Sequence, residues 1–457
     1  MTALATIVPG KRGDLQDFAA AIADVPMLDD PAQIRAKSQD FYWYSPILEK
    51  QLRGKTADLV VCPRDEADVL RVARACVRFR MPLTVRGGGT GNYGQAVPLA
   101  GGVVLDMSAL ASVEWHRPGL VRVAAGMKMV ELDAALRPQG WELRMHPSTK
   151  RSATIGGFVA GGSGGVGSIT YGGLREAGNV LAVRIVTLED EPRILELRGR
   201  DALAVNHAYG TTGIITALEM PLAPAWNWID VIVAFDAFRD AVACGHALAL
   251  ADGIVKKLLT PIAWPIPSFF KPFRAHCPEG RSILMAMIAE PSLDAFAELA
   301  AAMGGDITYR KPTSEDAGGR PLYECTWNHT TLYALKADKT VTYLQAMYPA
   351  ERLLDKVDEI AALFGDELIG HLEFIRFGGR ATASGLPVVR YTTPERLDEI
   401  IALHEARGVS IANPHVVTLE DGSRHKRADS DQLGFKHRVD PYGLMNPGKM
   451  RSFVAEK

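Results

Sequence analysis

The distribution of apolar and polar positions along the chain predicts short strands that alternate with amphipathic helices. The apolar run 59–62 is typical of a buried strand. The residues after Asp65 place Val69, Val72 and Cys76 on one helical face. Further elements are expected in this order: strands at 82–85, 103–107 and 121–126, a helix ending at Gly140, a hairpin over 180–197 and a strand at 214–222.

The second half of the chain repeats a different pattern, in which apolar strands alternate with longer helices over 227–408. This pattern predicts an antiparallel sheet covered by helices. Residues 1–53 are predicted to form a helical lead-in that Pro26 and Pro31 interrupt. The turn-rich segment 409–457 is expected to return to the first domain, at 54–226. The predicted fold class is α+β.

Two glycine-rich stretches stand at the centre of the first domain. The first is VRGGGTGN at 85–92, and the second has nine glycines among residues 156–173. Consecutive glycines allow positive φ, and their N–H groups can converge on an anion. The glycine density of 156–173 disfavours helix and strand interiors. The two stretches therefore predict a long phosphate-bearing ligand that is held from both sides.

A Rossmann dinucleotide site is the main alternative, since G-x-G-x-x-G occurs at 89–94 and at 162–167. That pattern is informative only where it follows a strand and opens a helix. QAVPLAGG follows the first match and SITYGG follows the second, and neither stretch is typical of a helix start. Flexible loops without a ligand are a second alternative, which the apolar strands beside both stretches disfavour.

Composition narrows the class of protein further. The net charge is −2 and 47% of residues are apolar, which is ordinary for a globular protein and disfavours nucleic acid as a partner. Five cysteines without CxxC spacing indicate reduced thiols and no zinc or iron–sulfur site. No apolar run reaches 18 residues, and the N-terminus lacks a long apolar segment. We therefore expect a cytoplasmic protein without a transmembrane helix.

Four motifs carry a resemblance to a known family. RGGGTGNYGQAVPL, HPSTKRSATIGGFVAGGSGGVGSITYG, YGTTGIIT and DPYGLMNPGK occur in this order. They resemble the FAD-binding PCMH-type fold of the vanillyl-alcohol oxidase superfamily. Within it, the chain most resembles the FAD-linked oxidase branch. This branch contains glycolate oxidase catalytic subunits, D-lactate dehydrogenases and D-2-hydroxyglutarate dehydrogenases. The resemblance implies a two-part FAD-binding PCMH-type domain at 54–226 and an antiparallel-sheet-plus-helices substrate (cap) domain at 227–408.

The resemblance also implies which residues bind FAD. The loop after the third strand would wrap the pyrophosphate, the second glycine-rich stretch would line the dinucleotide, and a later strand would meet the adenine half. Some relatives attach FAD through a histidine in the first loop, where this chain has Thr90, so we expect non-covalent FAD. The implied set is Arg86, Gly87, Gly88, Gly89, Thr90, Gly91, Asn92, Pro147, Ser148, Thr154, Ile155, Gly156, Gly157, Phe158, Gly161, Gly162, Ser163, Gly165, Gly213, Ile214, Ile215 and Asn446.

The substrate half departs from the family pattern. Acid-oxidising relatives hold a divalent metal with the motifs HxGDGNLH and SGEHG. This chain keeps His371 and His415 but has Pro414 in place of the glutamate. Two histidines without an oxygen ligand make a poor metal site, so no metal is expected. The carboxylate-binding arginine of a W-x-x-R segment is also missing from TWNHTTLYALK, which argues against a simple 2-hydroxy acid.

Oxidation of a C–H bond by flavin needs a base, and neutral histidine is suited to that task near pH 7. The candidates are His415, His371 and His329, each of which could instead be a hydrogen-bonded core residue. His404, His425 and His437 lie among charged residues and are expected at the surface. The substrate contacts are expected from Tyr323, Asn328, Arg376 and Asn413.

These observations predict an FAD-dependent oxidase or dehydrogenase that acts on the CH–OH group of a small hydroxylated compound, 2-hydroxy acids included. The alternatives are a flavin enzyme of the same fold that oxidises a phenol, polyol or amine, and an electron-relaying subunit of a multi-subunit oxidase. Oxygen, a quinone or a cytochrome could accept the electrons, and both a homodimer and partner subunits stay open.

Overall fold

The structure is a computed structural model, and it describes residues 12–314, 319–422 and 430–455. Its N-terminal segment forms three short helices, α1 (Leu15–Ala21), α2 (Pro31–Lys37) and α3 (Pro46–Leu52). Pro31 does more than interrupt a helix, because it is the first residue of α2, where its missing N–H has no role. Asp30 caps this helix and accepts the N–H of Gln33 at 2.8 Å.

The first sheet has the strand order β1-β2-β4-β3, formed by β1 (Met27–Leu28), β2 (Leu59–Val61), β4 (Val103–Asp106) and β3 (Leu83–Arg86). Both β2 and β3 run parallel to β4. Helix α4 (Glu66–Arg78) connects them, and its buried face includes Val69, Val72 and Cys76, as the spacing predicted. Parallel strands joined by a helix direct the loop after β3 away from the sheet, toward the cavity described below.

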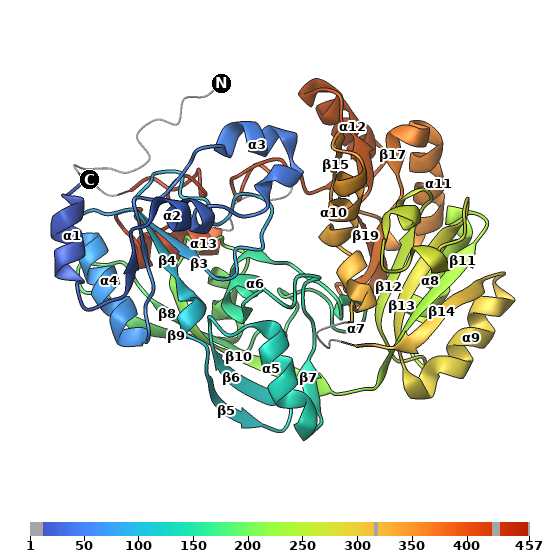
Figure 1. The fold of residues 1–457 in the computed structure, drawn as a ribbon, viewed down its shortest axis with the longest axis horizontal. Coiled ribbons are helices and arrows are strands. Elements are labelled where there is room, and N and C mark those ends of the chain that lie inside the picture. The colour runs from blue at the N-terminus through green and yellow to red at the C-terminus, as the bar shows by residue number, and fades with distance from the viewer. Residues whose placement is uncertain (1–11, 315–318, 423–429, 456–457) are drawn as a thin grey trace.

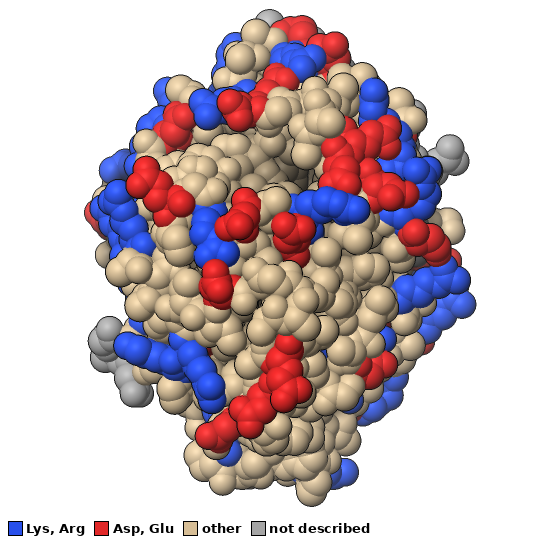
Figure 2. All heavy atoms as spheres, turned by 90° about the vertical axis from the view of Figure 1, so that its right-hand side faces the viewer, with Lys and Arg blue, Asp and Glu red and all other residues tan. Residues whose placement is uncertain are grey.

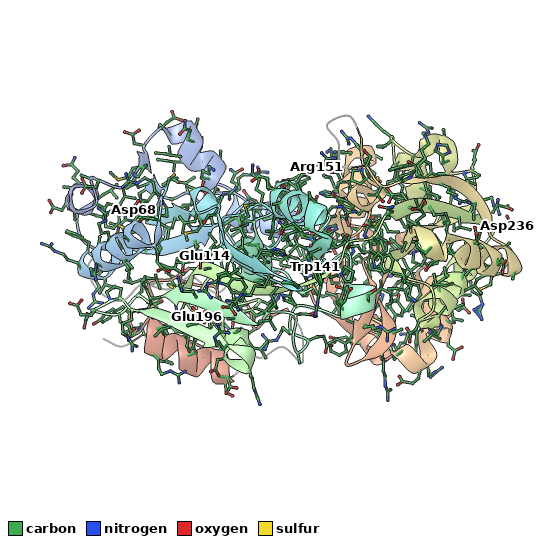
Figure 3. The ribbon with its side chains drawn as sticks, turned by 90° about the horizontal axis from the view of Figure 1, so that it is seen from below. Asp68, Glu114, Trp141, Arg151, Glu196 and Asp236 are labelled. Atoms are coloured by element: carbon green, nitrogen blue, oxygen red, sulfur yellow. The ribbon has the colours of Figure 1, made fainter. Side chains whose placement is uncertain are left out.

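The second sheet is antiparallel. Its order is β5-β6-β10-β8-β9, formed by β5 (Val113–Arg117), β6 (Leu120–Ala124), β10 (Ile214–Pro224), β8 (Ala182–Val186) and β9 (Ile194–Arg198), and β7 (Trp141–Leu143) also pairs with β10. The predicted hairpin is confirmed as β8–β9. Arg122 of β6 pairs with Glu114 of the neighbouring strand β5 and with Glu196 of β9, and Figure 3 labels both glutamates. Cross-strand ion pairs of this kind fix the register.

Helices in the glycine-rich stretch correct one expectation. The helix predicted to end at Gly140 is α5 (Met129–Leu136), followed by a 3₁₀ turn in which Gly140 has a φ of 80°. The stretch 156–173, where helix was disfavoured, nevertheless contains α6 (Ile155–Gly161) and α7 (Ser168–Tyr171). The helix α6 forms because Thr154 caps it and because Gly156 packs against Ala125, where an added Cβ would lie 2.6 Å from the alanine Cβ.

The second half of the chain contains three antiparallel sheets among its described residues, rather than the single sheet expected. The largest has the order β12-β13-β11-β14, formed by β12 (Lys256–Ile262), β13 (Ser282–Ala289), β11 (Trp228–Phe235) and β14 (Asp306–Pro312). The others comprise β15 (Val341–Tyr343), β20 (Val388–Arg390) and β17 (Leu368–Ile369), and then β18 (Leu372–Phe377), β19 (Arg380–Gly385), β16 (Ala346–Met347) and β21 (Ser410–Ile411).

The second and third of these sheets separate at residues 370–371, which connect β17 to β18. Gly370 lies against the ring of Phe238, and an added Cβ there would be only 2.3 Å from that ring. The helices of this half are α8 (Phe238–Leu250), α9 (Leu293–Ala302), α10 (Asn328–Ala337), α11 (Leu353–Phe364) and α12 (Pro394–Ala406). Apolar residues of α8 share one core with the sheets of β11 and β18. The α+β prediction with antiparallel sheets and helices in the second half is confirmed.

The chain ends beside its first sheet. Leu83 of β3 donates its N–H to the carbonyl of Leu444 at 2.8 Å, and Asn446 donates to the carbonyl of Leu83 at 2.7 Å. The last helix, α13 (Ser430–Val439), lies with the first half of the chain in Figure 1, while the second half of the chain forms the other side. Two ion pairs join the two halves. In the buried pair, Lys257 Nζ lies 2.6 Å from Glu142, and in the partly exposed pair, Arg151 Nε lies 2.5 Å from Glu324. Figure 3 places Arg151 between the halves.

The surface of the second half carries interspersed charges of both signs. Figure 2 shows this face, with a recess of uncharged residues in its upper part. A mixed surface of this kind produces no strong field for attracting a polyanion. Among the described helices, none combines the length and the apolar character needed to cross a membrane.

Candidate functional site

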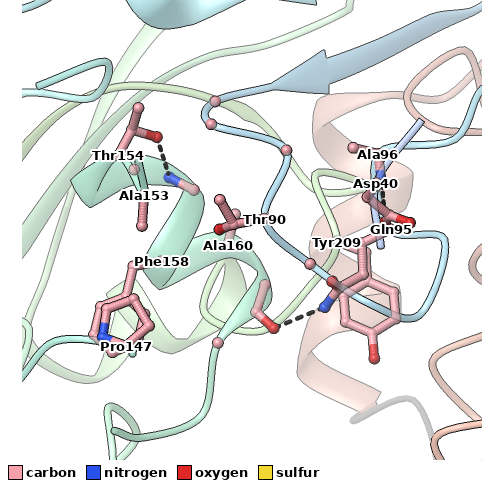
Figure 4. A pocket seen from close by; sticks show the side chains of 18 of the residues that line it. Asp40, Thr90, Gln95, Ala96, Pro147, Ala153, Thr154, Phe158, Ala160 and Tyr209 are labelled. Atoms are coloured by element: carbon pink, nitrogen blue, oxygen red, sulfur yellow. Dashed lines mark hydrogen bonds between the residues drawn. The ribbon is translucent and has the colours of Figure 1, made fainter. Parts of the chain in front are cut away.

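A cavity opens between the loop after β3 and the segment around α6. Most of its wall is formed by residues within the segments 85–96, 147–164 and 207–215, and Trp327, Asn328 and Gln345 of the second half complete it. Figure 4 shows part of this wall, including Thr90, Phe158 and Tyr209.

The backbone of loop 86–92 packs directly against the segment that precedes α6. A Cβ on Gly88 would lie 2.1 Å from the carbonyl oxygen of Ser152, and one on Gly87 would lie 2.0 Å from Thr154 Oγ1. Gly89 has a φ of +63°, which side chains rarely tolerate. The loop therefore requires glycine, and the wall it presents is made of peptide groups. Such a wall fits the phosphates of a dinucleotide, since backbone N–H groups bind phosphate oxygens.

A side-chain hydrogen bond links the two glycine-rich stretches: Gln95 Nε2 donates to the carbonyl of Gly161 at 2.8 Å. Within the second segment, Thr154 Oγ1 caps α6 by accepting the N–H of Gly157 at 3.2 Å. Both bonds are drawn in Figure 4. Because Gln95 follows the first stretch and Gly161 belongs to the second, this bond joins the two stretches along the cavity wall.

A buried charged cluster lies behind the first loop. Asp40 is 6% exposed and accepts the N–H groups of Tyr42 and Ala96, at 3.0 and 3.3 Å. Burial raises the pKa of Asp40, and the nearby cations Lys449 and Arg86 oppose that effect. Lys449 is fully buried and donates to the carbonyl of Gly94, while burial lowers its pKa. The cluster thus joins the lead-in, the loop and the C-terminus beneath the cavity.

Neutral polar groups line the end of the cavity that the second half provides. The Tyr93 hydroxyl is hydrogen-bonded to Gln345, Tyr343 and Asn328, and Asn92 Nδ2 donates to the Tyr343 hydroxyl at 2.7 Å. Burial raises the pKa of Tyr93 to about 12, so its phenol stays protonated at neutral pH. This end can therefore position a polar substrate through amides and hydroxyls.

Three of the cavity residues have strained backbones. His207, Tyr209 and Trp327 have φ values of 54°, 53° and 53°, and all three line the cavity. Asn446 helps to hold this geometry, because its Nδ2 donates to the carbonyls of Tyr209 at 2.6 Å and Gln95 at 2.8 Å. A non-glycine residue with a positive φ costs about 1–3 kcal/mol of conformational strain, and such residues cluster at functional sites.

Most of the residues implied for FAD surround this cavity. Those that line it are Arg86, Gly87, Gly88, Gly89, Thr90, Gly91, Asn92, Pro147, Ser148, Thr154, Gly156, Gly157, Phe158, Gly161, Gly162, Ser163, Gly213 and Ile215. Four others do not line it. Ile155, Gly165 and Ile214 are buried behind the wall, and Asn446 supports the wall as described above.

The three histidines predicted as bases do not line the cavity. His415 is 2% exposed; its Nδ1 lies 2.7 Å from Ser45 Oγ and its Nε2 lies 2.8 Å from the carbonyl of Tyr343. His371 is fully buried between the Leu386 carbonyl and Glu373, at 3.2 and 2.9 Å. His329 Nδ1 lies 3.1 Å from the Glu324 carbonyl. Burial lowers the pKa of both His415 and His329 to about 4.

Other residues singled out in the sequence lie as follows. Asn328 lines the cavity, whereas Tyr323 packs edge-on against His146 with ring centroids 4.8 Å apart. Arg376 donates to the Ile169 carbonyl and pairs with Asp252, and Asn413 accepts the N–H of His415 at 2.9 Å. His404 was expected at the surface, which is wrong: it is fully buried, stacked on Phe364.

His437 is half-buried beside Phe453, and His425 lies outside the described residues. Within residues 12–314, 319–422 and 430–455, no three His, Cys, Asp or Glu side chains gather as a metal would need.

Several lining residues were missed by the sequence analysis, namely Asp40, Tyr93, Gln95, His207, Tyr209, Trp327 and Gln345. The strained conformations of His207, Tyr209 and Trp327 leave no mark in residue type. Tyr93 and Gln95, however, closely follow the predicted loop 85–92, so their position in the sequence could have identified them as lining residues.

The comparisons with known proteins agree with this geometry. The model of the family described as FAD binding domain matches residues 57–194. This part of the chain is therefore similar to an FAD binding domain, in agreement with the resemblance carried by the motifs.

The glycolate oxidase subunit GlcD of Escherichia coli is 31% identical over 207 residues, covering 43% of this chain and 41% of GlcD. The D-lactate dehydrogenase of Archaeoglobus fulgidus is 24% identical over 86% of this chain and 91% of its own length. The match to GlcD thus spans about two fifths of the length of that protein, whereas the match to the D-lactate dehydrogenase spans most of its length. Among solved structures, an alkyldihydroxyacetonephosphate synthase has the same fold, with a TM-score of 0.71 and 15% identity over 97% of this chain and 86% of that chain.

Proposed function

We propose that this chain is an FAD-dependent oxidoreductase that oxidises the CH–OH group of a small hydroxylated compound. The observation that carries the proposal is the composition of the cavity wall: the FAD-binding domain forms most of it, and Trp327, Asn328 and Gln345 of the second half complete it. A substrate admitted from the second half would lie against the cofactor. The names of the relatives refer to glycolate and D-lactate, both of which carry a CH–OH group.

The residues fit a non-covalently held FAD. A bound FAD would supply the acceptor for a hydride from the substrate carbon. Arg86 and the peptide groups of loop 87–92 would hold the pyrophosphate, and Gly213 and Ile215 would line the adenine half. Thr90 occupies the place at which some relatives carry a linking histidine. The described lining residues include no cysteine, and their one histidine, His207, has its Nδ1 3.1 Å from the carbonyl of Gly162.

The base is best sought among groups that line the cavity. A bond from the Nδ1–H of His207 to the Gly162 carbonyl puts the basic lone pair on Nε2, the tautomer that can accept a proton. The Tyr93 phenol stays protonated and can only donate or accept a hydrogen bond. His207 is therefore the proposed proton acceptor, and His415, His371 and His329, with their enclosed rings, are retained as the alternatives to be tested.

The experiment is anaerobic reduction of the bound flavin by a panel of alcohols and hydroxy acids, in the native protein and in matched variants. His207→Gln should keep its FAD and reduce it at least about 100-fold more slowly, as expected for loss of a general base. His415→Gln is the matched control and should retain most of the native rate. If the flavin of the His207→Gln protein is reduced at the native rate, His207 is not the base, and His415, His371 and His329 become the candidates. A flavin that no CH–OH compound reduces would contradict the proposed oxidation itself.

A further inference from the structure

The charges around the cavity are unevenly distributed. Among the described lining residues, the ionised side chains are Asp40 and Arg86, and both belong to the part of the wall near the first glycine loop. Trp327, Asn328 and Gln345, which the second half contributes, are all neutral. The end of the cavity where a substrate would enter is therefore polar but uncharged.

Arg86 is already committed to the first loop. Its Nη1 donates to the Gln39 carbonyl at 2.5 Å, and its guanidinium packs beneath Gly89, within 2.0 Å of where a Cβ would lie. The carboxylates of Asp106 and Asp40 lie near enough to influence its pKa. A bound FAD would add the two negative charges of its pyrophosphate at this same loop. No cation among the described lining residues is then left for a substrate carboxylate.

Three arginines of the second half that could have bound a carboxylate are paired elsewhere. Arg376 is bound to Asp252 and to the Ile169 carbonyl. Arg380 pairs with Glu351, and Arg390 Nε donates to the Asp366 carbonyl at 2.8 Å. None of the three lines the cavity.

A buried acidic side chain lies behind the uncharged end. Glu373 is 1% exposed, and its carboxylate accepts the backbone N–H of Trp327 at 2.5 Å and the Thr260 hydroxyl at 2.6 Å. His371 Nε2 lies 2.9 Å from the same carboxylate. These bonds hold Trp327 at its φ of 53°. A substrate carboxylate next to Trp327 would approach this buried acidic side chain and would find no cation among the described lining residues to pair with, which is unfavourable.

The polar atoms at this end of the cavity suit a ligand that both donates and accepts hydrogen bonds. Trp327 Nε1 and Asn328 Oδ1 are buried and have no hydrogen-bond partner among the described residues. The indole N–H can only donate and the amide oxygen can only accept. A hydroxyl or a carboxamide satisfies both atoms, whereas a carboxylate offers acceptors alone.

We propose that the substrate is an uncharged hydroxylated compound, and that Trp327, Asn328, Tyr93 and Gln345 select it over the corresponding 2-hydroxy acid. This inference rests on the proposed function, because it assumes that the substrate meets FAD at this end of the cavity. In this arrangement Glu373 is a positioning residue, which acts through the backbone of Trp327.

The test compares ligands that differ only in charge. FAD-loaded protein is titrated with lactate against lactamide and with mandelate against mandelamide, at constant pH and ionic strength, and binding is read from the perturbed visible spectrum of the flavin. Each amide should bind at least about 100-fold more tightly than its acid, as expected when a buried charge lacks a partner. Because binding is observed without electron transfer, the result can be interpreted even if the proposed oxidation fails.

A charge introduced at the uncharged end gives the second arm. Asn328→Arg should shift the preference toward the acids by at least about 10-fold, since it supplies the missing counter-ion. Gln139→Arg, which adds the same charge at an exposed position, should leave the preference unchanged. Acids that bind the native protein as tightly as their amides, or a native protein that binds no member of either pair, would overturn the proposal.

Discussion

The close approach of Gly88 to Ser152 gives the sharpest prediction about the cofactor site. A Cβ at Gly88 would lie 2.1 Å from the Ser152 carbonyl oxygen and 3.3 Å from the Ala153 Cα. Ordinary contact begins near 3.4 Å, so Gly88→Ala must move one backbone segment against the other by about 1.3 Å. Both partners are backbone, and no side-chain rotation relieves the clash. Overpacking of this kind costs about 1–3 kcal/mol.

The displaced loop is the one that would hold the pyrophosphate, so this strain should appear in FAD affinity. We expect Gly88→Ala to weaken FAD binding about 5- to 150-fold, measured by titrating FAD into the apo-protein and following flavin fluorescence. Gly253→Ala is the control, because nothing lies within 4 Å of a Cβ at that exposed glycine. Native FAD affinity in a folded Gly88→Ala protein would refute the placement of the pyrophosphate against this loop.

Two further predictions concern stability. The pKa of His415 lies near 4 in the folded chain and near 6.5 ordinarily, so the unfolded chain binds the proton more tightly. Stability should fall as the pH drops from about 6.5 toward 4, by about 3 kcal/mol for this one group, and His415→Gln should show a smaller fall in urea titrations at both pH values. An identical pH dependence in the variant would exclude His415 as the cause. Lys257→Met breaks the buried pair with Glu142, whose partners are 5% and 1% exposed, and should lower the free energy of unfolding by about 3–5 kcal/mol. An unchanged melting temperature would show that Arg137 and Trp228 alone satisfy Glu142.

The glycine-rich loop could be predicted from sequence because its chemistry depends on missing side chains. Gly87, Gly88 and Gly89 have no Cβ, and the structure shows what occupies the space. The helix α4 was predictable for a similar reason, since its apolar spacing is local. The helix α6 was not, because its stability comes from the Thr154 cap and from the contact of Gly156 with Ala125, which lies far away in the sequence. Local propensity disfavours that helix, and tertiary packing outweighs it.

The candidate base shows the limit of reasoning from residue type. A histidine was expected to accept a proton, but whether it can do so depends on what its ring nitrogens contact. For His415 these partners are Ser45 and Tyr343, which are 370 and 72 positions away in the sequence. His207 carries no sequence signal that distinguishes it from the other histidines. Its position in the cavity wall follows from a strained backbone next to Tyr209, which Asn446 holds from the far end of the chain.

The central claim is that the cavity holds FAD without a covalent bond, and one measurement tests it directly. The protein is purified, supplied with FAD, passed over a desalting column and precipitated with acid, and flavin is measured in the supernatant and in the pellet. The structure predicts about one FAD per chain before precipitation, all of which is released into the supernatant. A chain that retains no flavin after desalting, or a denatured polypeptide that keeps it, would contradict the account.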